Sequence, residues 1–431
     1  MLRRNRFYRV LRTSLTIIAA AWRYLWLTLR SRWRLIAPSQ RAWDKAHTKT
    51  GQAVYGLATT LGGAYVKLGQ IVGGRGDFFP QALVAPLAGL HDRVPPRPFD
   101  ELREHVESEL GKPITEVFES VDEDALAAAS LAQVHRGVLK SGETVAIKIQ
   151  YPEARHLFPT DLGSLRRAVR VARRLNRALD LRGLVDELAQ FVVLELDFSR
   201  EASSTKRVRA NLLGDSGVDG AVVPLVHEEL STEKLLVLEF VDGISLANDA
   251  SLEEAGIDRA AVARKIAEIY GQMIFVHGFF NGDPHPGNFL ARVDGSVALL
   301  DFGLAKELPD GFAIGIAKMI VGVMAGNGEQ AIAAAESVGF VFRSRDPDPF
   351  LGTVRMLLGD YSNTDRLAKM MKATGVKEVP PAFALIVRAF VLLNGLSHRL
   401  VPDERVIMNT LAARLLAQLA TPQAGEKAAN A

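Results

Sequence analysis

The chain contains no cysteine among its 431 residues. Disulfides, thiolate metal sites and cysteine nucleophiles are therefore excluded. Hydrophobic residues make up 48% and charged residues 23%, an ordinary globular composition that excludes a disordered or fibrous protein. At roughly 100–200 residues per domain, the length predicts two or three domains. The net charge of +3 indicates no particular partner.

Acidic residues are nearly absent from the first 45 residues, and tryptophan is absent everywhere else. Residues 1–45 hold ten arginines and Lys45 against Asp44, so they carry +10 and leave −7 for the remaining 386 residues. A membrane-spanning run is also missing from this segment. Its longest uncharged stretch, Thr13–Trp22, has ten residues, whereas a spanning helix needs about 20. Arg23 would lie within any longer span, at a high energetic cost.

Helical periodicity predicts an amphipathic helix within residues 1–36. The apolar face comprises Tyr8, Leu11, Leu15, Ile18, Trp22, Leu25, Trp26, Leu29, Trp33 and Ile36, and the opposite face comprises Arg9, Arg12, Arg23, Arg30 and Arg34. A basic helix with tryptophans on its apolar face is typical of a segment that lies in a membrane surface and attracts anionic lipids. We therefore expect a cytoplasmic protein held peripherally at a membrane. No nucleic-acid partner is expected, because the acidic body repels phosphate.

Two alternatives remain open for this helix. Its apolar face could pack on the rest of the protein. The segment could instead be an organelle transit peptide, which would place the mature protein in an organelle matrix.

Glycine and proline residues typical of turns, together with changes in composition, divide the chain into five segments. They are the surface segment 1–45, a helical extension 46–120, a mixed β/α lobe 121–243, a mainly helical lobe 244–420 and a disordered tail 421–431. Hairpins are expected where strands 134–139 and 143–150 flank a turn at 140–142, and again around Asp294-Gly295. A helix should begin at Pro98-Phe99-Asp100. The apolar stretches Phe312–Met324 and Pro381–Leu393 are expected to be core helices, too short or too charged to span a bilayer.

A cluster of polar residues occurs in the motif Asn281-Gly-Asp-Pro-His-Pro-Gly-Asn288, and the motif Asp301-Phe-Gly303 follows it. Phosphoryl transfer needs a carboxylate near the attacking oxygen and oxygen ligands that hold Mg²⁺ on the phosphates. Asp283 suits the first role, and Asn288 and Asp301 suit the second. In Val145-Ala-Ile-Lys148, the lysine is suited to pair with nucleotide phosphates.

Glycine is missing where a phosphate-binding loop would lie, because residues 127–130 read Ala-Ala-Ala-Ser. Alanine does not reach the positive-φ conformations that glycine adopts, which disfavours ordinary protein-kinase activity; an alanine-rich helix start remains an alternative. Residues 194–202 are expected to form one helical stretch that carries Glu195, Asp197 and Glu201. Lys67-Leu-Gly-Gln70, taken alone, indicates only a solvated helix end.

Together these motifs resemble the UbiB/ABC1/AarF/ADCK family of atypical kinase-like proteins from about Thr59 to Leu400. The resemblance rests on Lys67–Gln70 with its continuation Arg75, Asp77 and Pro80, on Ala127–Ser130, Lys148, Glu195 with Asp197 and Glu201, Asp283–Asn288, and Asp301. It implies an α+β, two-lobed protein-kinase-like fold that binds ATP (or ADP) and Mg²⁺ between the lobes, with the helical N-terminal extension packed over the nucleotide cleft.

The resemblance also implies a role for each matching residue. Catalytic roles fall to Asp283 and Lys148; nucleotide binding to Ala127, Ala128, Ala129, Ser130, Lys148, Glu201, Glu239 and Val241; metal binding to Asn288 and Asp301; and obstruction of protein substrates to Lys67, Gln70, Glu195 and Asp197. Three departures stand out. Asn281-Gly282 replaces the usual His-Ala, Gly73-Gly74 replaces a common serine, and the C-terminal membrane helices of many members are not expected here.

Three functions are compatible with these motifs. The first is a membrane-associated ATPase or atypical kinase that supports isoprenoid-quinone (ubiquinone) biosynthesis or lipid metabolism, with quinone-biosynthesis enzymes or quinone precursors as partners. The second is a small-molecule phosphotransferase similar to aminoglycoside or choline kinases, which lack the Lys-x-Gly-Gln extension. The third is a nucleotide-binding scaffold without turnover, for which the alanine-rich loop is the support.

Overall fold

The computed structural model describes residues 5–32, 38–73, 79–90, 96–175, 181–214, 217–359 and 375–402, together with 404, 406, 407, 409–411, 413 and 415. The predicted tail 421–431, the motif residues Arg75 and Asp77, and Trp33, Arg34 and Ile36 of the first helix lie outside these residues. The chain forms two compact units. Unit 1 comprises Met1–Arg200 and His227–Phe240, and unit 2 comprises Glu201–Val226 and Val241–Ala431.

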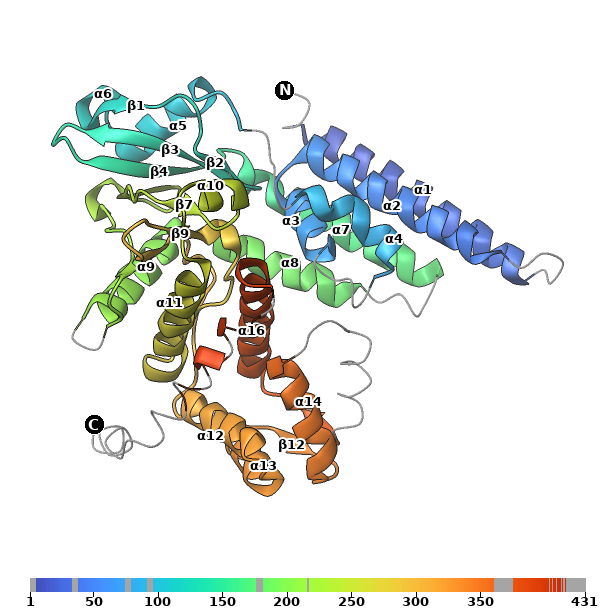
Figure 1. The fold of residues 1–431 in the computed structure, drawn as a ribbon. Coiled ribbons are helices and arrows are strands. Elements are labelled where there is room, and N and C mark those ends of the chain that lie inside the picture. Colours follow the sequence, from blue (N-terminus) through green and yellow to red (C-terminus); the bar gives the residue numbers. More distant parts are fainter. Residues whose placement is uncertain are drawn as a thin grey trace. The chain divides into compact units, whose positions relative to one another are not determined.

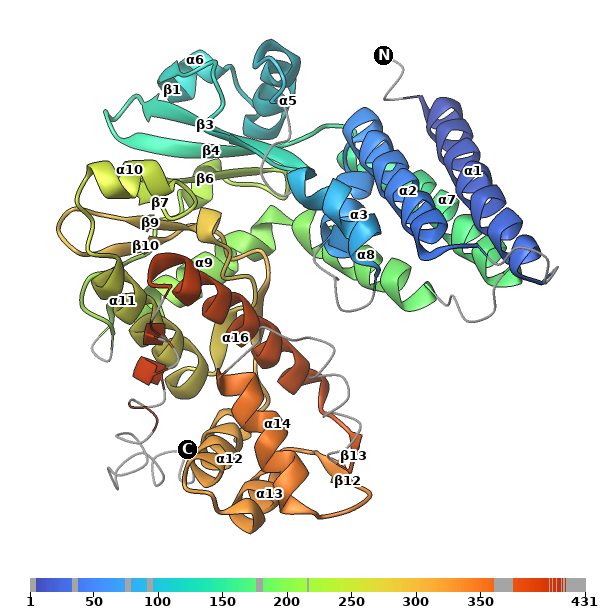
Figure 2. The same ribbon diagram turned by 45° about the vertical axis from the view of Figure 1, so that its right-hand side comes forward.

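Unit 1 combines a layer of helices with a small sheet (Figures 1 and 2). Its helices are α1 (Arg6–Arg32), α2 (Gln40–Leu61), α3 (Ala64–Gly73), α4 (Gln81–Val84), η2 (Ala85–Leu90), α5 (Asp100–Leu110), α6 (Ile114–Val117), α7 (Ala154–Leu175), α8 (Arg182–Glu195) and η3 (Glu228–Leu230). Its strands are β1 (Phe118–Val121), β2 (Ala127–Ala128), β3 (Ala132–Leu139), β4 (Thr144–Gln150) and β6 (Leu235–Glu239). Helix α9 (Phe198–Leu213) begins in unit 1 and continues in unit 2.

The sheet of unit 1 is antiparallel, in the order β1-β3-β4-β6, with β2 paired to β3. Along β4, Val145, Ile147 and Ile149 are buried in a core shared with α5. Because successive side chains of a strand point to opposite faces, Lys148 lies on the other face. The β3–β4 turn occurs at Gly142, whose φ of 89° favours glycine. The predicted hairpin and the predicted start of α5 at Asp100 are both confirmed.

Helix α1 packs against α2 and α7, and its side chains Arg9, Thr13 and Leu27 are buried. Arg9 is buried and donates to both carboxylate oxygens of Asp161 on α7, at 2.7 and 2.5 Å. Its third bond, 2.7 Å long, reaches the carbonyl of Leu61. The hydroxyls of Thr13 and Tyr65 lie 2.6 Å apart in the same buried cluster. The alternative in which the predicted apolar face packs on the protein is wrong, because most of that face is exposed. The exposed residues are Leu11, Leu15, Ile18, Trp22, Trp26 and Leu29.

In its described residues, unit 2 is mainly helical and carries three small sheets. Its helices are α10 (Asp249–Glu254), α11 (Arg259–Gly271), η4 (Gln272–Val276), η5 (Pro286–Asn288), α12 (Phe312–Met324), α13 (Gly328–Ser337), α14 (Pro347–Gly359) and α16 (Pro381–Leu400). Its strands are β5 (Ala221–Val222), β7 (Ile244–Ser245), β8 (Phe279–Asn281), β9 (Phe289–Ala291), β10 (Val297–Leu299), β11 (Ala305–Glu307), β12 (Val341–Phe342) and β13 (Val376–Glu378).

Short strands hold the polar loop of unit 2 in place. Strands β9 and β10 form the predicted hairpin, which turns at Gly295 with φ 82°. Strand β8 ends at Asn281 and pairs with β11, so Asn281 lies opposite Ala305. The loop that contains Asp283 is thereby tied to the segment that follows Asp301.

Helix α12 matches its predicted bounds, whereas α16 continues seven residues beyond the predicted Leu393. With 20 residues, α16 is the one helix in the described part of the chain that is long and apolar enough to cross a bilayer. The prediction that this segment is too short or too charged to span is therefore wrong as far as length and composition go. In the structure, its residues Ile386, Ala389 and Leu393 are fully buried in the core of unit 2.

Candidate functional site

The amide of Asn281 connects the two acidic motifs of unit 2. Its side chain is buried, and Nδ2 donates to the backbone carbonyl of Asp301 over 2.7 Å. Its Oδ1 accepts a 2.9 Å bond from the backbone N–H of Asp283. Because a buried amide with both ends bonded has one orientation, the loop is held in a fixed position relative to the Asp301 segment. Asn281 stands where the resembled family usually has histidine, so the amide takes over a supporting position.

Asp283 lies at the surface of unit 2 beside a cation that the motifs did not indicate. Arg388 of α16 donates to its Oδ1 over 3.3 Å, and both side chains are about one-third exposed. Tyr270 lies fully buried near this carboxylate, and its hydroxyl has no hydrogen-bond partner within the described part of the chain. Burial, with the negative charge of Asp283, raises the pKa of Tyr270 well above its usual value. Tyr270 is therefore a neutral hydroxyl at working pH.

Asn288 and Asp301 are oriented by backbone hydrogen bonds. Asn288 donates Nδ2 to the carbonyl of Asp283 over 3.2 Å, which makes Oδ1 the atom of that amide that can face a cation. Asp301 Oδ1 accepts from the N–H of Gly303 over 2.9 Å. A β-carbon at Gly303 would lie 3.4 Å from Asp301 Oδ1 and 3.5 Å from the carboxylate of the buried Glu201. Glu201 and Asp301 thus both lie beside Gly303, while Asn288 is bonded to the backbone of Asp283.

Asn288 and Asp301 offer oxygen atoms of the kind that Mg²⁺ takes as ligands in proteins. No group of three or more His, Cys, Asp or Glu side chains suited to a metal occurs among the residues that the structure describes. Mg²⁺ commonly takes one or two protein oxygens and completes its shell with water and phosphate oxygens. Asn288 and Asp301 supply oxygens of that kind, so they could hold the metal once a nucleotide provides the rest.

Lys148 lies half-buried in the middle of β4, where its backbone pairs with Val134 and Leu236. Its Nζ is 5.2 Å from the centre of the Phe198 ring, a cation–π contact. The strand thus holds the lysine on the face opposite the hydrophobic core of unit 1.

The alanine-rich segment forms a tight turn. Ala127 and Ala128 make up β2 and pair with Val134 and Gln133 of β3. The N–H of Ala129 donates to the carbonyl of Ala132 over 2.8 Å, and Ser130 is buried in the turn. An alanine-rich helix start is therefore wrong. The next residue, Leu131, packs with α2 and α3, so the turn is anchored to the helical extension.

The extension contributes one ion pair to the predicted set. Lys67 on α3 pairs with Glu195 at the end of α8 and lies near the ring of Phe191. Gln70 donates to the carbonyl of Leu90 over 2.9 Å and so fixes η2. The solvated-helix-end interpretation of Lys67 is wrong, because only 16% of its side chain is exposed.

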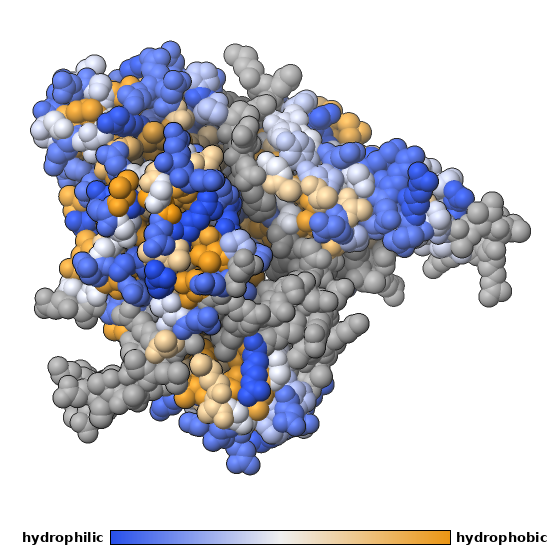
Figure 3. Space-filling model, viewed as in Figure 1, coloured by the Kyte–Doolittle hydropathy of each residue, from blue (hydrophilic) through white to orange (hydrophobic). Residues whose placement is uncertain are grey.

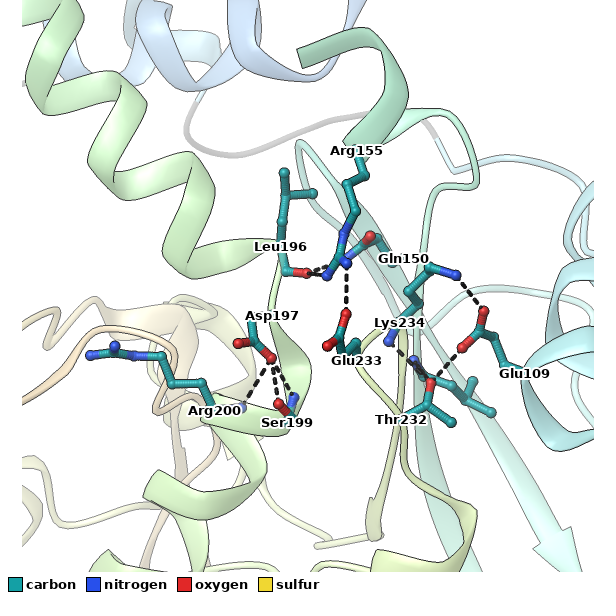
Figure 4. A network of polar contacts seen from close by, with 11 residues as sticks. Glu109, Gln150, Arg155, Leu196, Asp197, Ser199, Arg200, Thr232, Glu233 and Lys234 are labelled. Carbon is teal, nitrogen blue, oxygen red and sulfur yellow. Dashed lines mark hydrogen bonds and ion pairs between the residues drawn. The ribbon is translucent and has the colours of Figure 1, made fainter. Parts of the chain in front are cut away.

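The predicted continuous helix from 194 to 202 is interrupted. Helix α8 ends at Glu195 and α9 begins at Phe198. Figure 4 shows the contacts at this break. The carbonyl of Leu196 accepts bonds from Gln150 and Arg155, at 3.0 and 2.8 Å. Asp197 caps α9 by accepting from the N–H and hydroxyl of Ser199, at 3.1 and 2.5 Å. Asp197 therefore has a local capping role, while Glu195 meets the extension.

Glu239 and Val241 lie where the chain passes from one unit to the other. Glu239 is the exposed last residue of β6, opposite Val145, in unit 1. Val241 is the first residue of the second stretch of unit 2. Their expected role in nucleotide binding stays a prediction.

Three side chains around Asp283 were not among the predicted site residues: Asn281, Tyr270 and Arg388. Asn281 had a signal, because it opens the polar motif and departs from the usual histidine. Tyr270 and Arg388 had none, since they lie in apolar helical stretches.

The chain is similar to known kinase-like proteins. Residues 89–335 match the ABC1 atypical kinase-like domain. The chain is 30% identical over 356 residues to the protein ACTIVITY OF BC1 COMPLEX KINASE 7, chloroplastic, of Arabidopsis thaliana, across 80% of this chain and 51% of that protein. It is 34% identical over 276 residues to mouse AarF domain-containing protein kinase 1, across 63% of this chain and 52% of that protein. The chain thus spans about half the length of these curated relatives.

A solved structure of Rv3197 from Mycobacterium tuberculosis, in complex with erythromycin, resembles the present fold. Its TM-score is 0.59 at 25% identity, over 89% of this chain and 99% of that chain. With the antiparallel sheets and the many helices described above, these similarities confirm the predicted α+β, kinase-like fold class.

Proposed function

We propose a function from the premise that the chain belongs to the ABC1 atypical kinase-like family. The protein binds a magnesium nucleotide and transfers the terminal phosphoryl group of ATP. In its basal reaction the acceptor is water. One observation carries this proposal: the buried Asn281 amide fixes the Asp283 loop against Asp301. Phosphoryl transfer depends chiefly on positioning and on charge, and a locked pair of acidic motifs supplies the first.

Each side chain then has a separate task. Asp283 orients the attacking water and accepts its proton as the oxygen bonds to the terminal phosphorus and ADP leaves. Lys148 supplies a positive charge for phosphate oxygens. Bound Mg²⁺ neutralises the charge on the phosphates, and Asn288 and Asp301 are the residues that would hold it. The segment 127–130 lacks the glycines of an ordinary phosphate-binding loop, which disfavours ordinary protein-kinase activity.

We further propose that the biological setting is isoprenoid-quinone biosynthesis or lipid metabolism in a cytoplasmic, peripherally membrane-bound protein. Support comes from the resemblance and from the Lys67–Glu195 pair, which places the Lys-x-Gly-Gln motif in a folded contact. Small-molecule kinases lack that motif, so the pair favours this setting.

Phosphorylation of a small molecule is a second candidate. It is favoured by the structural similarity to Rv3197, whose solved complex contains the macrolide erythromycin. In that case turnover of ATP should rise with an aminoglycoside, a macrolide or choline. Stimulation by phenols that resemble quinone precursors would favour the first candidate.

The test compares purified wild type with Asp283→Asn and with the matched control Asp310→Asn, an exposed aspartate of the same unit. Phosphate release should fall at least about a hundredfold in Asp283→Asn, the loss typical of a removed general base. The control should hydrolyse ATP like wild type, and both variants should bind the nucleotide as measured by calorimetry. Equal hydrolysis by wild type and Asp283→Asn would contradict the enzyme proposal and leave a nucleotide-binding scaffold.

A second variant separates metal binding from chemistry. Asp301→Asn should raise the Mg²⁺ concentration needed for nucleotide binding, because one charged oxygen is lost from the metal site. A Mg²⁺ titration that coincides with that of wild type would remove Asp301 from the metal site.

A further inference from the structure

The outward face of α1 carries a row of large exposed side chains. Figure 3 shows one face of the molecule, on which hydrophobic residues are interspersed with hydrophilic ones. On α1, apolar residues repeat every three or four positions, and between 44% and 76% of each is exposed. This row, the α1 stripe, comprises Phe7, Leu11, Leu15, Ile18, Trp22, Trp26 and Leu29. Phe7 was not among the predicted residues but lies on the same face.

The stripe is fixed in its outward position by the opposite face of the helix. Arg9 and Thr13 are buried and bonded to Asp161 and Tyr65, and Tyr24 bonds His47 of α2 over 2.9 Å. Rolling the helix to bury the stripe would break these contacts and leave Asp161 buried without its cation, which is strongly unfavourable. The folded unit therefore presents seven large apolar side chains to its surroundings. Large exposed apolar patches usually mark an interaction site.

Basic residues flank the stripe. Helices α1 and α7, which pack side by side, contain twelve arginines and one acidic residue, Asp161, which is already paired with Arg9. Arg167, Arg170 and Arg174 are exposed and lie on the face of α7 opposite its buried residues. Arg30 stacks over Trp26 of the stripe at 4.6 Å.

We propose that the α1 stripe is a docking surface for an anionic lipid bilayer. The helix lies along the membrane surface with its apolar face among the acyl chains and headgroups, while the arginines of α7 meet anionic headgroups. Charge decides between this partner and a second copy of the chain. Pairing two stripes would bring the arginines of two copies together with no opposing acid from α1 or α7, whereas anionic lipids neutralise them.

The chain carries its own reporter for this surface. All four tryptophans lie between residues 22 and 43, and two of them, Trp22 and Trp26, belong to the stripe. Tryptophan emission of the wild-type protein therefore reports on this region without labelling. We expect a blue shift on adding vesicles of phosphatidylcholine with phosphatidylglycerol, and quenching when the acyl chains are brominated. Unchanged emission with both vesicles would overturn the proposal.

Two substitutions test the stripe itself. Leu15→Glu and Ile18→Glu should each lower the vesicle partition coefficient at least about tenfold, since each removes a large aliphatic side chain from the lipid interface. The matched control is Val293→Glu, the same kind of change at an 83% exposed residue of unit 2. It should bind vesicles like wild type. Thermal melts establish that the variants are folded, because the substituted side chains make few contacts in the protein.

The basic flank has its own test. Arg167→Gln, Arg170→Gln and Arg174→Gln should each weaken binding to anionic vesicles about fivefold and leave binding to neutral vesicles unchanged. Sedimentation velocity without lipid tests the other occupant. Two results together would overturn the lipid proposal: a wild-type dimer that dissociates in Ile18→Glu, and wild-type tryptophan emission that does not change on adding vesicles. They would assign the stripe to a second copy of the chain. None of these measurements depends on ATP turnover, so the outcome is independent of the proposed activity.

Discussion

Arg9 and Asp161 form a buried ion pair with two parallel hydrogen bonds across a sequence separation of 152 residues. No more than 3% of either side chain is exposed. A charge at this depth is stable only while its partner is present. The pair therefore makes the basic first helix part of the folded unit, although its composition resembles that of a detachable segment.

Removing one partner of this pair should strongly destabilise unit 1. Asp161→Asn is expected to lower the free energy of unfolding by about 3–5 kcal/mol, because Arg9 is left buried without a counter-charge. The double variant Arg9→Met/Asp161→Leu should lose less, since neither charge is then buried. Chemical denaturation measures both, with the exposed Arg12→Met on the same helix as control. A loss in Asp161→Asn no larger than in the control would show that α1 is only loosely attached.

The amide of Asn281 should matter more for turnover than for folding. Asn281→Ala removes two buried hydrogen bonds and should cost about 1–3 kcal/mol of stability, while ATP hydrolysis falls because the Asp283 loop is no longer fixed. The matched control is Asn327→Ala, which removes a helix cap on α13 in the same unit and should cost about 1 kcal/mol without affecting turnover. Asn281→His, the residue usual in the family, should retain more activity than alanine. Parallel losses of turnover in the two alanine variants would reduce the role of Asn281 to stability.

Arg388 is expected to act on Asp283 directly. Arg388→Gln removes a charged hydrogen bond and should lower kcat/KM for ATP roughly tenfold, in the lower part of the range for a charge-assisted bond because the pair is partly exposed. Arg399→Gln, at the end of the same helix and paired with Asp249, serves as control and should leave kcat/KM unchanged. Full activity of Arg388→Gln would mean that the contact with Asp283 has no part in catalysis.

Acid should destabilise unit 1 through His135. This histidine is buried in β3, and burial lowers its pKa below the usual 6.5 against the opposing effect of the Asp122 carbonyl, to which its Nδ1 is bonded at 2.8 Å. Since the unfolded chain then binds a proton that the folded protein does not, stability is full above pH 6.5 and falls as the pH drops below it. The slope due to this one group is at most about 1.4 kcal/mol per pH unit.

Replacing His135 by Gln should therefore flatten the pH dependence of unfolding between pH 6.5 and 5.5, even though the variant loses some stability at pH 7.5. Denaturation at several pH values measures the slope, and His398→Gln, at an exposed position of α16, is the control. An unchanged slope in His135→Gln would assign the acid sensitivity to other buried histidines.

Local features of the fold were predictable from the sequence. The β3–β4 and β9–β10 hairpins follow from short apolar runs around Gly142 and Gly295, and α5 follows from Pro98 and Asp100. The polar loop was found for the same reason, because Asp283 and Asn288 lie five residues apart in one motif. In each case the determining residues are neighbours in the chain.

Features that depend on distant residues were missed. Periodicity identified an apolar and a basic face on α1. Which face packs on the rest of unit 1, however, depends on Asp161, far along the chain. The break after Glu195 depends on Gln150 and Arg155, which satisfy the carbonyl of Leu196. Arg388 reaches Asp283 across 105 residues. Turn-forming residues and hydrophobic periodicity do not encode these contacts between distant residues, so only the folded chain reveals them.

The position of Arg388 within α16 also bears on where this helix can reside. The length and apolarity of α16 resemble those of a membrane-inserted segment, yet its buried side chains belong to the core of unit 2. An arginine near the middle of such a helix opposes insertion by about 2.5–3.5 kcal/mol. The side chain that contacts Asp283 in the folded protein therefore also disfavours the insertion of this helix into a bilayer.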